Sequence, residues 1–238
     1  KGEYRLFELQ KNELEAFLNH SQQESFAGLN VTIPYKTEVI RFMERISPEA
    51  AKIGAVNTIA LTGSLEGFNT DYYGIDYTLQ KNRIKLDGKK ALITGSGGAA
   101  KAVAAYLQDS GVRQLHIAGR NPELTKEKHP FAMAIHYDEI EQYQPYDIIV
   151  NTTPVGMHPN TGISPLSRNQ LKGTGFLFDL IYNPAQTELM RMACSMGIPN
   201  VNGLFMLVAQ AVKAQEIWNR QSFGLDMADA KLKRISMK

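Results

Sequence analysis

The spacing of apolar positions divides the chain into two stretches with different patterns. Up to about residue 80 the apolar runs are short: residues 4–9 alternate in strand fashion, and residues 37–46 have helical spacing. From residue 90 onward, a buried strand at 90–94 is followed by an alanine-rich helix at 99–108, and strand and helix patterns then alternate. This alternation predicts a parallel sheet with helices on both faces.

Shorter signals add further elements to both stretches. Ser47 followed by Pro48 predicts the cap and the first residue of a helix. Residues 62–64 predict a hairpin turn between strands at 56–61 and 65–69. The remaining predicted elements are a helix at 72–80 and strands at 28–34, 114–118, 147–151 and 176–181 and near 199–201.

A glycine-rich turn joins the first strand of the second stretch to its helix. Gly95, Gly97 and Ala100 fit the pattern G-x-G-x-x-[GA], in which the first glycine permits a tight turn and the second lets the backbone approach a pyrophosphate. The helix start offers free N–H groups to phosphates. The motif alone also fits a glycine-rich turn in another α/β protein, but the flanking strand and helix favour a dinucleotide site.

The end of the next strand indicates which dinucleotide binds. NAD-specific sites place an acid about 20 residues after the glycines, where it holds the ribose 2′-OH. Here the strand ends in Ala118-Gly119-Arg120-Asn121, without a carboxylate. Arg120 could bind a 2′-phosphate through two parallel hydrogen bonds, or it could be a solvated surface arginine. We therefore expect NADP rather than NAD.

Composition narrows the class of protein further. The 26 basic and 24 acidic residues give a net charge of +2, so neither nucleic acid nor an anionic membrane is the expected partner. The sequence has no apolar run of membrane-spanning length and no signal segment at its start, and its one cysteine, Cys194, cannot form an internal disulfide. The five histidines are scattered, so no metal site is expected. We expect a cytoplasmic protein that acts on a small molecule.

Three segments of the first stretch carry polar groups at the ends of apolar runs. They are residues 30–36 (NVTIPYK), 54–58 (GAVNT) and 67–74 (GFNTDYYG). Polar groups cost free energy when they are buried without partners. These side chains are therefore expected to pair with one another or to face a ligand.

These segments resemble motifs of the shikimate dehydrogenase family, namely N-V-T-x-P-x-K, G-A-V-N-T and N-T-D-x-x-G, and they occur in the family's order. The second stretch adds G-x-G-G-A at 95–99, N-T-T-P-x-G-M at 151–157, D-x-x-Y at 179–182 and N-G-x-x-M-L-x-x-Q-A at 202–211. The resemblance thus covers nearly the whole chain.

The resemblance implies an NADP-dependent oxidoreductase that reduces 3-dehydroshikimate to shikimate, on the pathway to chorismate and the aromatic amino acids. It also implies an α/β fold of two domains. Residues 1–80 with 204–238 would form an α/β substrate domain, and residues 81–203 a Rossmann-type, doubly wound nucleotide domain. A monomer or a homodimer is expected.

The resemblance also assigns residues to roles. Lys36 and Asp71 match the catalytic residues, and both also contact substrate. Further residues match positions that bind the substrate's hydroxyls and carboxylate or line its pocket: Asn30, Thr32, Asn57, Tyr182 and Gln210. The cofactor residues are Gly95, Ser96, Gly97, Gly98, Ala99, Arg120, Leu180, Gly203 and Met206, the last three beside the nicotinamide.

General chemistry fits the two catalytic assignments. Reducing a ketone needs a hydride on carbon and a proton on oxygen, and a lysine ammonium can stabilise the developing alkoxide and donate that proton. Each residue also has a structural interpretation: Lys36 as a surface lysine at a helix start, Asp71 as the N-cap of the helix at 72–80, and Asn57 as a turn residue. Which of Lys36 and Asp71 transfers the proton stays open.

The sequence departs from the family pattern in two places. The family's S-x-S-x-x-x-H-N segment, whose serines bind the substrate carboxylate, is not in this sequence, and we expect those residues to exist outside this numbering. Gly119-Arg120-Asn121 keeps the arginine of the family's N-R-[TS] but changes both of its neighbours. Two alternatives stay open: a quinate/shikimate dehydrogenase that uses NAD, and a non-catalytic nucleotide-binding sensor of the same fold.

Overall fold

The computed structural model describes residues 2–24, 26–61 and 63–236, which form two compact units. The first unit comprises Lys1–Thr70 with Ala214–Ser222, and the second comprises Asp71–Lys213 with Phe223–Lys238. The chain thus divides after residues 70, 213 and 222, whereas the sequence led us to expect boundaries near 80 and 204, with residues 204–238 all in the first domain. The functional division into a substrate domain and a nucleotide domain stays a prediction.

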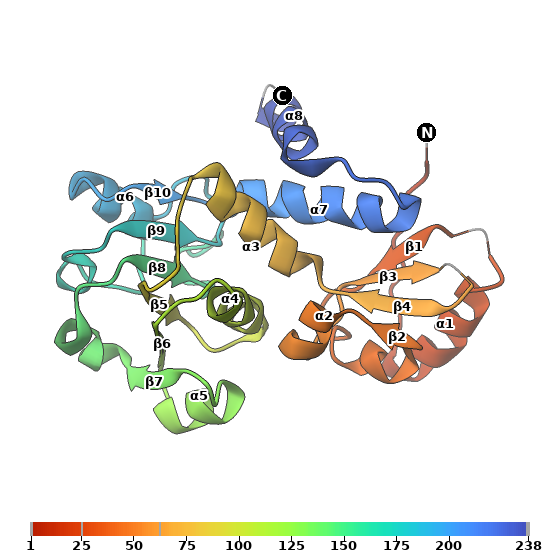
Figure 1. The fold of residues 1–238 in the computed structure, drawn as a ribbon, viewed down its shortest axis with the longest axis horizontal. Coiled ribbons are helices and arrows are strands. Elements are labelled where there is room, and N and C mark those ends of the chain that lie inside the picture. Colours follow the sequence, from red (N-terminus) through yellow and green to blue (C-terminus); the bar gives the residue numbers. More distant parts are fainter. Residues whose placement is uncertain (1, 25, 62, 237–238) are drawn as a thin grey trace. The chain divides into compact units, whose positions relative to one another are not determined.

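The first unit is built on a four-stranded sheet (Figure 1). Its strands are β1 (Gly28–Asn30), β2 (Arg45–Ile46), β3 (Thr58–Leu61) and β4 (Leu65–Phe68), in the order β1-β3-β4-β2. Strand β3 pairs antiparallel with both β1 and β4, and β2 pairs parallel with β4. The antiparallel pairing expected for the hairpin is confirmed, and Thr62 of its turn lies outside the described residues.

The first unit also contains α1 (Leu14–Ser21), which follows the 3-10 helix η1 (Lys11–Glu13), α2 (Pro48–Ile53), and the last turns of α7 (Leu204–Asn219). Helix α2 begins as predicted, because Ser47 Oγ accepts a hydrogen bond from Ala50 N (3.4 Å) and Pro48 is its first residue. Gly54, in the left-handed conformation, ends it. The core of the unit consists of Leu14, Leu18, Val39, Ala50, Val56, Ile59 and Leu65.

Two predictions for the first unit are wrong. Residues 37–46 do not form one helix but the 3-10 helix η2 (Glu38–Phe42) and strand β2, because the backbone of residues 45–46 pairs with β4 instead of continuing the helix. Residues 4–9 do not form a strand. No sheet ladder joins residues 4–9 to β1. Together with residues 26–35 they line a pocket of about 1290 Å³.

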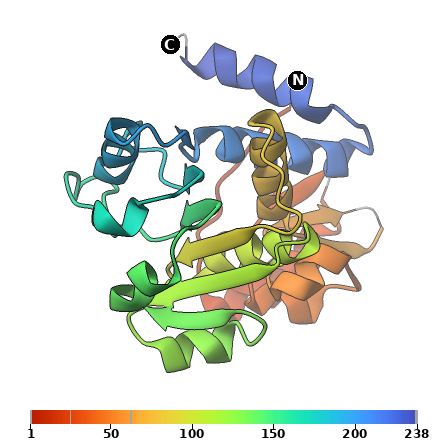
Figure 2. The same ribbon diagram turned by 60° about the vertical axis from the view of Figure 1, so that its left-hand side comes forward.

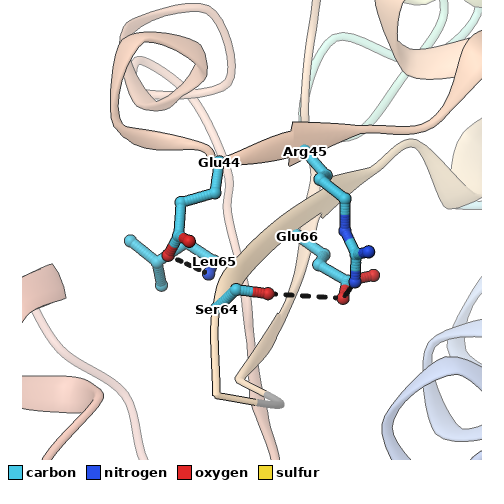
Figure 3. Close-up of polar contacts among 5 residues, drawn as sticks. All are labelled: Glu44, Arg45, Ser64, Leu65 and Glu66. Carbon is cyan, nitrogen blue, oxygen red and sulfur yellow. Dashed lines mark hydrogen bonds and ion pairs between the residues drawn. The ribbon is translucent and has the colours of Figure 1, made fainter.

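Side-chain contacts fix β2 and its preceding residue against β4 (Figure 3). Arg45 and Glu66 are ladder partners and form an ion pair. Glu44 Oε1 accepts a hydrogen bond from Leu65 N (3.1 Å), and Ser64 Oγ donates one to Glu66 Oε1 (3.4 Å). These contacts hold strand β4, which leads directly into the rest of the third polar segment, residues 67–74.

The second unit is built on a six-stranded parallel sheet (Figure 1). Its strands are β5 (Lys90–Thr94), β6 (Gln114–Gly119), β7 (Met133–His136), β8 (Ile148–Asn151), β9 (Phe176–Asp179) and β10 (Asn200–Val201). The spatial order β7-β6-β5-β8-β9-β10 is the 3-2-1-4-5-6 order of the Rossmann fold. The expected doubly wound α/β architecture is confirmed, with β7 as a strand that the sequence patterns did not predict.

The helices that begin or lie in the second unit are α3 (Thr70–Lys81), α4 (Gly98–Asp109), α5 (Pro122–Lys128), α6 (Glu188–Ser195), α7 (Leu204–Asn219) and α8 (Gly224–Ser236), with 3-10 helices η3 (Tyr137–Tyr143) and η4 (Asn169–Leu171). Helix α4 buries a run of small residues, Ala100, Ala102, Ala104 and Ala105, which allow a helix to pack closely against its surroundings. In Figure 2 the strands coloured yellow-green to green point the same way.

Two findings concern the described residues as a whole. Within residues 2–24, 26–61 and 63–236, no helix combines the length and the apolar character needed to cross a membrane. Over the same ranges, no group of three or more His, Cys, Asp or Glu side chains could hold a metal ion.

Candidate active site

Backbone hydrogen bonds join the three polar segments of the first unit. Val31 N donates to Asn57 O (2.8 Å), and Val56 N donates to Lys36 O (2.7 Å). Asn57 N donates in turn to Phe68 O (3.0 Å). The segment at 54–58 therefore bonds to both of the others, and the structure brings together the three segments expected to carry the substrate site.

Asn57 is the polar centre of these segments and is 5% exposed. Its Oδ1 accepts hydrogen bonds from Thr70 N (2.7 Å), Thr70 Oγ1 (3.1 Å) and Thr58 Oγ1 (3.1 Å). An amide oxygen has two lone pairs, so three donors saturate it. Asn57 thus fixes the residue directly before Asp71, and its Nδ2 is the group suited to donate to a substrate.

Asn30 and Thr32 are both exposed, but only Asn30 joins this cluster through its side chain in the described contacts. Asn30 Nδ2 donates to Thr58 Oγ1 (3.2 Å) and to Asn57 O (3.4 Å). Thr32 lies in the loop that follows β1. The two predicted substrate ligands therefore differ. Neighbouring polar groups hold the Asn30 side chain, whereas the loop after β1 places Thr32.

Lys36 and Asp71 belong to different compact units. Lys36 is half-buried, and its carbonyl is fixed by Val56. Asp71 is also half-buried and is the second residue of α3, which begins at Thr70. The interpretation of Asp71 as an N-cap is wrong, because it lies inside the first helical turn, where an acidic residue stabilises the helix macrodipole. The pairing of Lys36 with Asp71 stays a prediction.

In the second unit the strand order reverses between β5 and β8, and ligands of such sheets bind beyond the carboxyl ends of the strands at this point. Gly95 follows β5 and has a φ of +92°. A Cβ there would lie 2.9 Å from Thr152 Oγ1 and 2.9 Å from Thr153 Cγ2, in the segment after β8. Backbone conformation and close contact both require glycine at this position.

The start of α4 has open space beside it. Gly97, Gly98 and Ala99 are exposed, and Gly97 is the N-cap residue. A Cβ on Gly97 or Gly98 would meet no atom within 4 Å. The unpaired N–H groups and the positive end of the helix dipole suit an anion. Residues 95–99 therefore fit the pyrophosphate of a dinucleotide.

Arg120 directly follows β6, the neighbour of β5, and is exposed. It leaves the sheet at the same edge as the glycine-rich turn. Burial raises the pKa of Tyr137, while the nearby Gly95 backbone and the charge of Arg120 oppose this rise. Tyr137 thus lies near both Gly95 and Arg120. No sequence motif marks Tyr137.

His129 is a second residue of this region that no motif marks. It is 1% exposed and follows the last residue of α5. Burial lowers the pKa of His129, the charges of Lys101 and Lys128 act in the same direction, and the nearby Ser96 backbone opposes them. The neutral ring is therefore favoured, and its buried Nε2 has no hydrogen-bond partner among the described residues.

Two of the residues expected beside the nicotinamide, Leu180 and Gly203, lie in contact. Gly203 N donates a hydrogen bond to Ile181 O (3.1 Å), and a Cβ on Gly203 would lie 2.0 Å from Leu180 O. Glycine is therefore required at position 203 by the backbone of the segment after β9. Tyr182, in the same segment, is 48% exposed, and no described contact joins it to the other predicted ligands.

Met206 and Gln210 lie where α7 packs on α3. A Cβ on Gly74 would lie 2.8 Å from Met206 O and 3.4 Å from Gln210 Cβ. Gly74 is the glycine of the N-T-D-x-x-G motif and lies one helical turn after Asp71. The structure thus places Met206 and Gln210 beside the first turns of the helix that carries Asp71.

Comparisons with known proteins agree with this geometry. A family model described as the shikimate dehydrogenase substrate binding domain matches residues 1–59. The shikimate dehydrogenase (NADP(+)) of Clostridium beijerinckii is 40% identical over 223 residues, which make up 92% of this chain and 81% of that relative.

Two solved structures extend the similarity to the fold. The chorismate mutase/shikimate 5-dehydrogenase fusion protein of Clostridium acetobutylicum has a TM-score of 0.93 and 39% identity, over 97% of this chain and 85% of that chain. Shikimate 5-dehydrogenase of Thermus thermophilus, in complex with NADP(H) and shikimate, has a TM-score of 0.83 and 30% identity, over 95% of this chain and 85% of that chain. Motifs, strand order and relatives agree, and the chain belongs to the shikimate dehydrogenase family.

Proposed function

We propose that this protein catalyses the reversible, NADPH-dependent reduction of 3-dehydroshikimate to shikimate, on the pathway to chorismate and the aromatic amino acids. The observation that carries the proposal is the joining of the three polar segments by backbone hydrogen bonds, in a chain of the shikimate dehydrogenase family. The glycine-rich turn at the reversal of strand order supports the choice of a dinucleotide cofactor.

Lys36 is the proposed catalytic acid. NADPH, when bound, supplies the hydride that the carbonyl carbon accepts. The Lys36 ammonium donates a hydrogen bond to the carbonyl oxygen, stabilises the negative charge that develops there and provides the proton. In the direction of shikimate oxidation, the neutral Lys36 amine accepts the proton of the hydroxyl group.

Asp71 is proposed to orient Lys36 and to accept a hydrogen bond from a substrate hydroxyl. The remaining proposed substrate ligands, which bind hydroxyls and the carboxylate or line the pocket, are Asn30, Thr32, Asn57, Tyr182 and Gln210.

The proposed cofactor contacts divide along the dinucleotide. The backbone of residues 95–99 binds the pyrophosphate, and Arg120 binds the 2′-phosphate through its guanidinium. Leu180, Gly203 and Met206 lie beside the nicotinamide. The end of β6, Gly119-Arg120-Asn121, carries an arginine and no carboxylate, which supports NADP over NAD.

Steady-state assays with shikimate and with quinate, each with NADP and with NAD, test this proposal. We expect the highest kcat/KM for shikimate with NADP. A dominant activity for quinate with NAD would instead support an NAD-linked quinate/shikimate dehydrogenase. NADP binding without turnover of either alcohol would support the nucleotide-binding sensor. The cytoplasmic location and the monomeric or homodimeric state stay predictions.

A further inference from the structure

A row of buried polar side chains crosses the second unit's sheet at its carboxyl edge. Thr94, Asn151 and Asp179 are the last residues of β5, β8 and β9, are aligned partners in the ladder, and are each 0% exposed. Thr94 Oγ1 donates to Asn151 Oδ1 (2.9 Å). Asn151 Nδ2 donates to Asp179 Oδ1 (2.9 Å). Three neighbouring strands are therefore linked through their side chains.

The same row is tied to the segments that follow the strands. Asn151 Oδ1 also accepts hydrogen bonds from Thr153 N (3.0 Å) and Thr153 Oγ1 (2.8 Å). Asp179 accepts one from Ile181 N (3.2 Å) and one from Thr187 Oγ1 (2.6 Å). Thr187 is in turn the N-cap of α6. The row thus fixes the loop after β8, the segment after β9 and the start of a helix.

Only one assignment of donors and acceptors satisfies the hydrogen bonds of the row. Asn151 Oδ1 receives three donors, so its Nδ2 must face Asp179. The Asp179 carboxylate, when ionised, has only acceptors and receives three donors. Burial raises the pKa of Asp179, and its three hydrogen bonds oppose this rise. Burying a carboxylate costs free energy that its three hydrogen bonds offset, so the side chains of the row are held in one arrangement.

We propose that Asp179 and Asn151 are positioning residues of the cofactor site, an inference that rests on the proposed NADP-dependent function. Each strand of the row leads directly into a cofactor segment. Residues 95–99 follow β5, the threonines that border Gly95 follow β8, and Leu180, which contacts Gly203, follows β9. The row therefore sets the spacing between the pyrophosphate turn and the nicotinamide segment, and hydride transfer depends steeply on such spacing.

Exchanging the two side chains tests the row while nearly preserving its atoms. Asn151→Asp sets two carboxylates against each other, and we expect kcat to fall about 100-fold and the NADP⁺ dissociation constant to rise. Asp179→Asn leaves a neutral side chain of the same size, with an expected loss of about tenfold. In the double variant Asn151→Asp/Asp179→Asn, the new carboxylate at 151 accepts every donor that faced the amide oxygen, and the new amide at 179 donates to it. The Ile181 N–H loses its acceptor, because Asp179 Oδ1 accepts from both Asn151 Nδ2 and Ile181 N. We therefore expect the double variant to recover part of the loss caused by Asn151→Asp.

The readouts separate positioning from general stability. NADP⁺ dissociation constant, kcat and the KM for shikimate are measured below each variant's unfolding temperature. The shikimate KM is expected to change less than the NADP⁺ dissociation constant, because Tyr182 is the one proposed substrate ligand in a segment that the row fixes. The matched control is Asp147→Asn, since Asp147 links β8 to β5 at the opposite edge by accepting from Lys90 N (2.9 Å) and Lys89 Nζ (3.0 Å). This control should bind NADP⁺ as the wild type does.

Two outcomes would overturn the inference. One is an Asp179→Asn variant with wild-type NADP⁺ affinity and kcat. The other is a double variant as defective as Asn151→Asp. If Asn151→Asp does not fold, recovery of folding and NADP⁺ binding in the double variant supports the row. A wild-type protein that binds NADP⁺ but turns over neither alcohol contradicts the proposed function instead, and the NADP⁺ affinities still decide the inference.

Discussion

The two compact units hold their functional segments by different means. In the first unit, three polar segments are joined by backbone hydrogen bonds and by one saturated amide, that of Asn57. In the second unit, regular parallel strands end in register, close contacts at Gly95 and Gly203 fix two of the loops that follow, and the row of Thr94, Asn151 and Asp179 links the strand ends. The first arrangement is centred on one polar side chain, whereas the second combines a polar row with strand register and the absence of a Cβ.

This difference has a physical consequence for mutations. A side chain that serves as the hub of several hydrogen bonds leaves several buried groups unsatisfied when it is removed. Replacing a glycine that lies in van der Waals contact with backbone leaves no polar group unsatisfied. Any larger residue, however, forces the backbone apart. The two units are therefore expected to fail in different ways.

The largest effect on stability is expected for Gly203→Ala, because the new Cβ would lie 2.0 Å from the Leu180 carbonyl oxygen. We expect a loss of about 3 kcal/mol in the free energy of unfolding, measured by urea denaturation. Gly98→Ala is the matched control, since nothing lies within 4 Å of its Cβ. Equal stability of the two variants would contradict the role assigned to close backbone contact.

A smaller loss is expected for Asn57→Ala in the first unit. The variant leaves the Thr70 N–H and two threonine hydroxyls without their shared acceptor, at a cost of about 2 kcal/mol. Asn30→Ala is the control, because Asn30 is exposed, the exposed Tyr4 hydroxyl that donates to it can turn to water, and Asn57 O keeps its hydrogen bond from Val31 N. If both variants lost the same stability, Asn57 would not be the hub of the polar segments.

The second unit should also be the acid-sensitive one. Burial lowers the pKa of His129 and of His116 below the ordinary value of 6.5. The unfolded chain then binds more protons than the folded chain, so stability is full above pH 6.5 and falls as the pH drops toward the lowered values. His129→Gln should reduce the difference in unfolding free energy between neutral and mildly acidic pH. An unchanged difference, with exposed His20→Gln as control, would argue against the buried neutral ring.

The smallest effect is expected at the surface of the first unit, where Arg45 pairs with Glu66 (Figure 3). The arginine side chain is 72% exposed, and exposed ion pairs contribute about 0.5 kcal/mol. Arg45→Ala should therefore lower the urea midpoint slightly, and less so at high salt. A loss comparable to that of Asn57→Ala would mean that this strand pair, rather than the amide hub, fixes the polar segments.

The same difference explains what the sequence could predict. The Rossmann unit was foreseeable, because buried strands, an alanine-rich helix and glycines at a strand end each have a local signal. Strand β7 was missed, since it is a short edge strand whose Met133 is 45% exposed. The predicted strand at 4–9 is wrong, because no ladder joins it to β1. The row formed by Thr94, Asn151 and Asp179 depends on strand register, which no local pattern records. In the first unit, the functional residues were identified by resemblance to the family.

The most direct test of the proposed function is the Lys36→Ala variant, assayed for shikimate oxidation with NADP⁺ and for NADP⁺ binding. The account predicts that kcat falls about 100-fold or more, because the catalytic acid is removed, while the NADP⁺ dissociation constant is unchanged. Lys11→Ala, which removes an exposed lysine of the same unit that pairs with Glu38, should retain wild-type kcat. Turnover by Lys36→Ala at the wild-type rate would contradict the role of Lys36 as the proton donor.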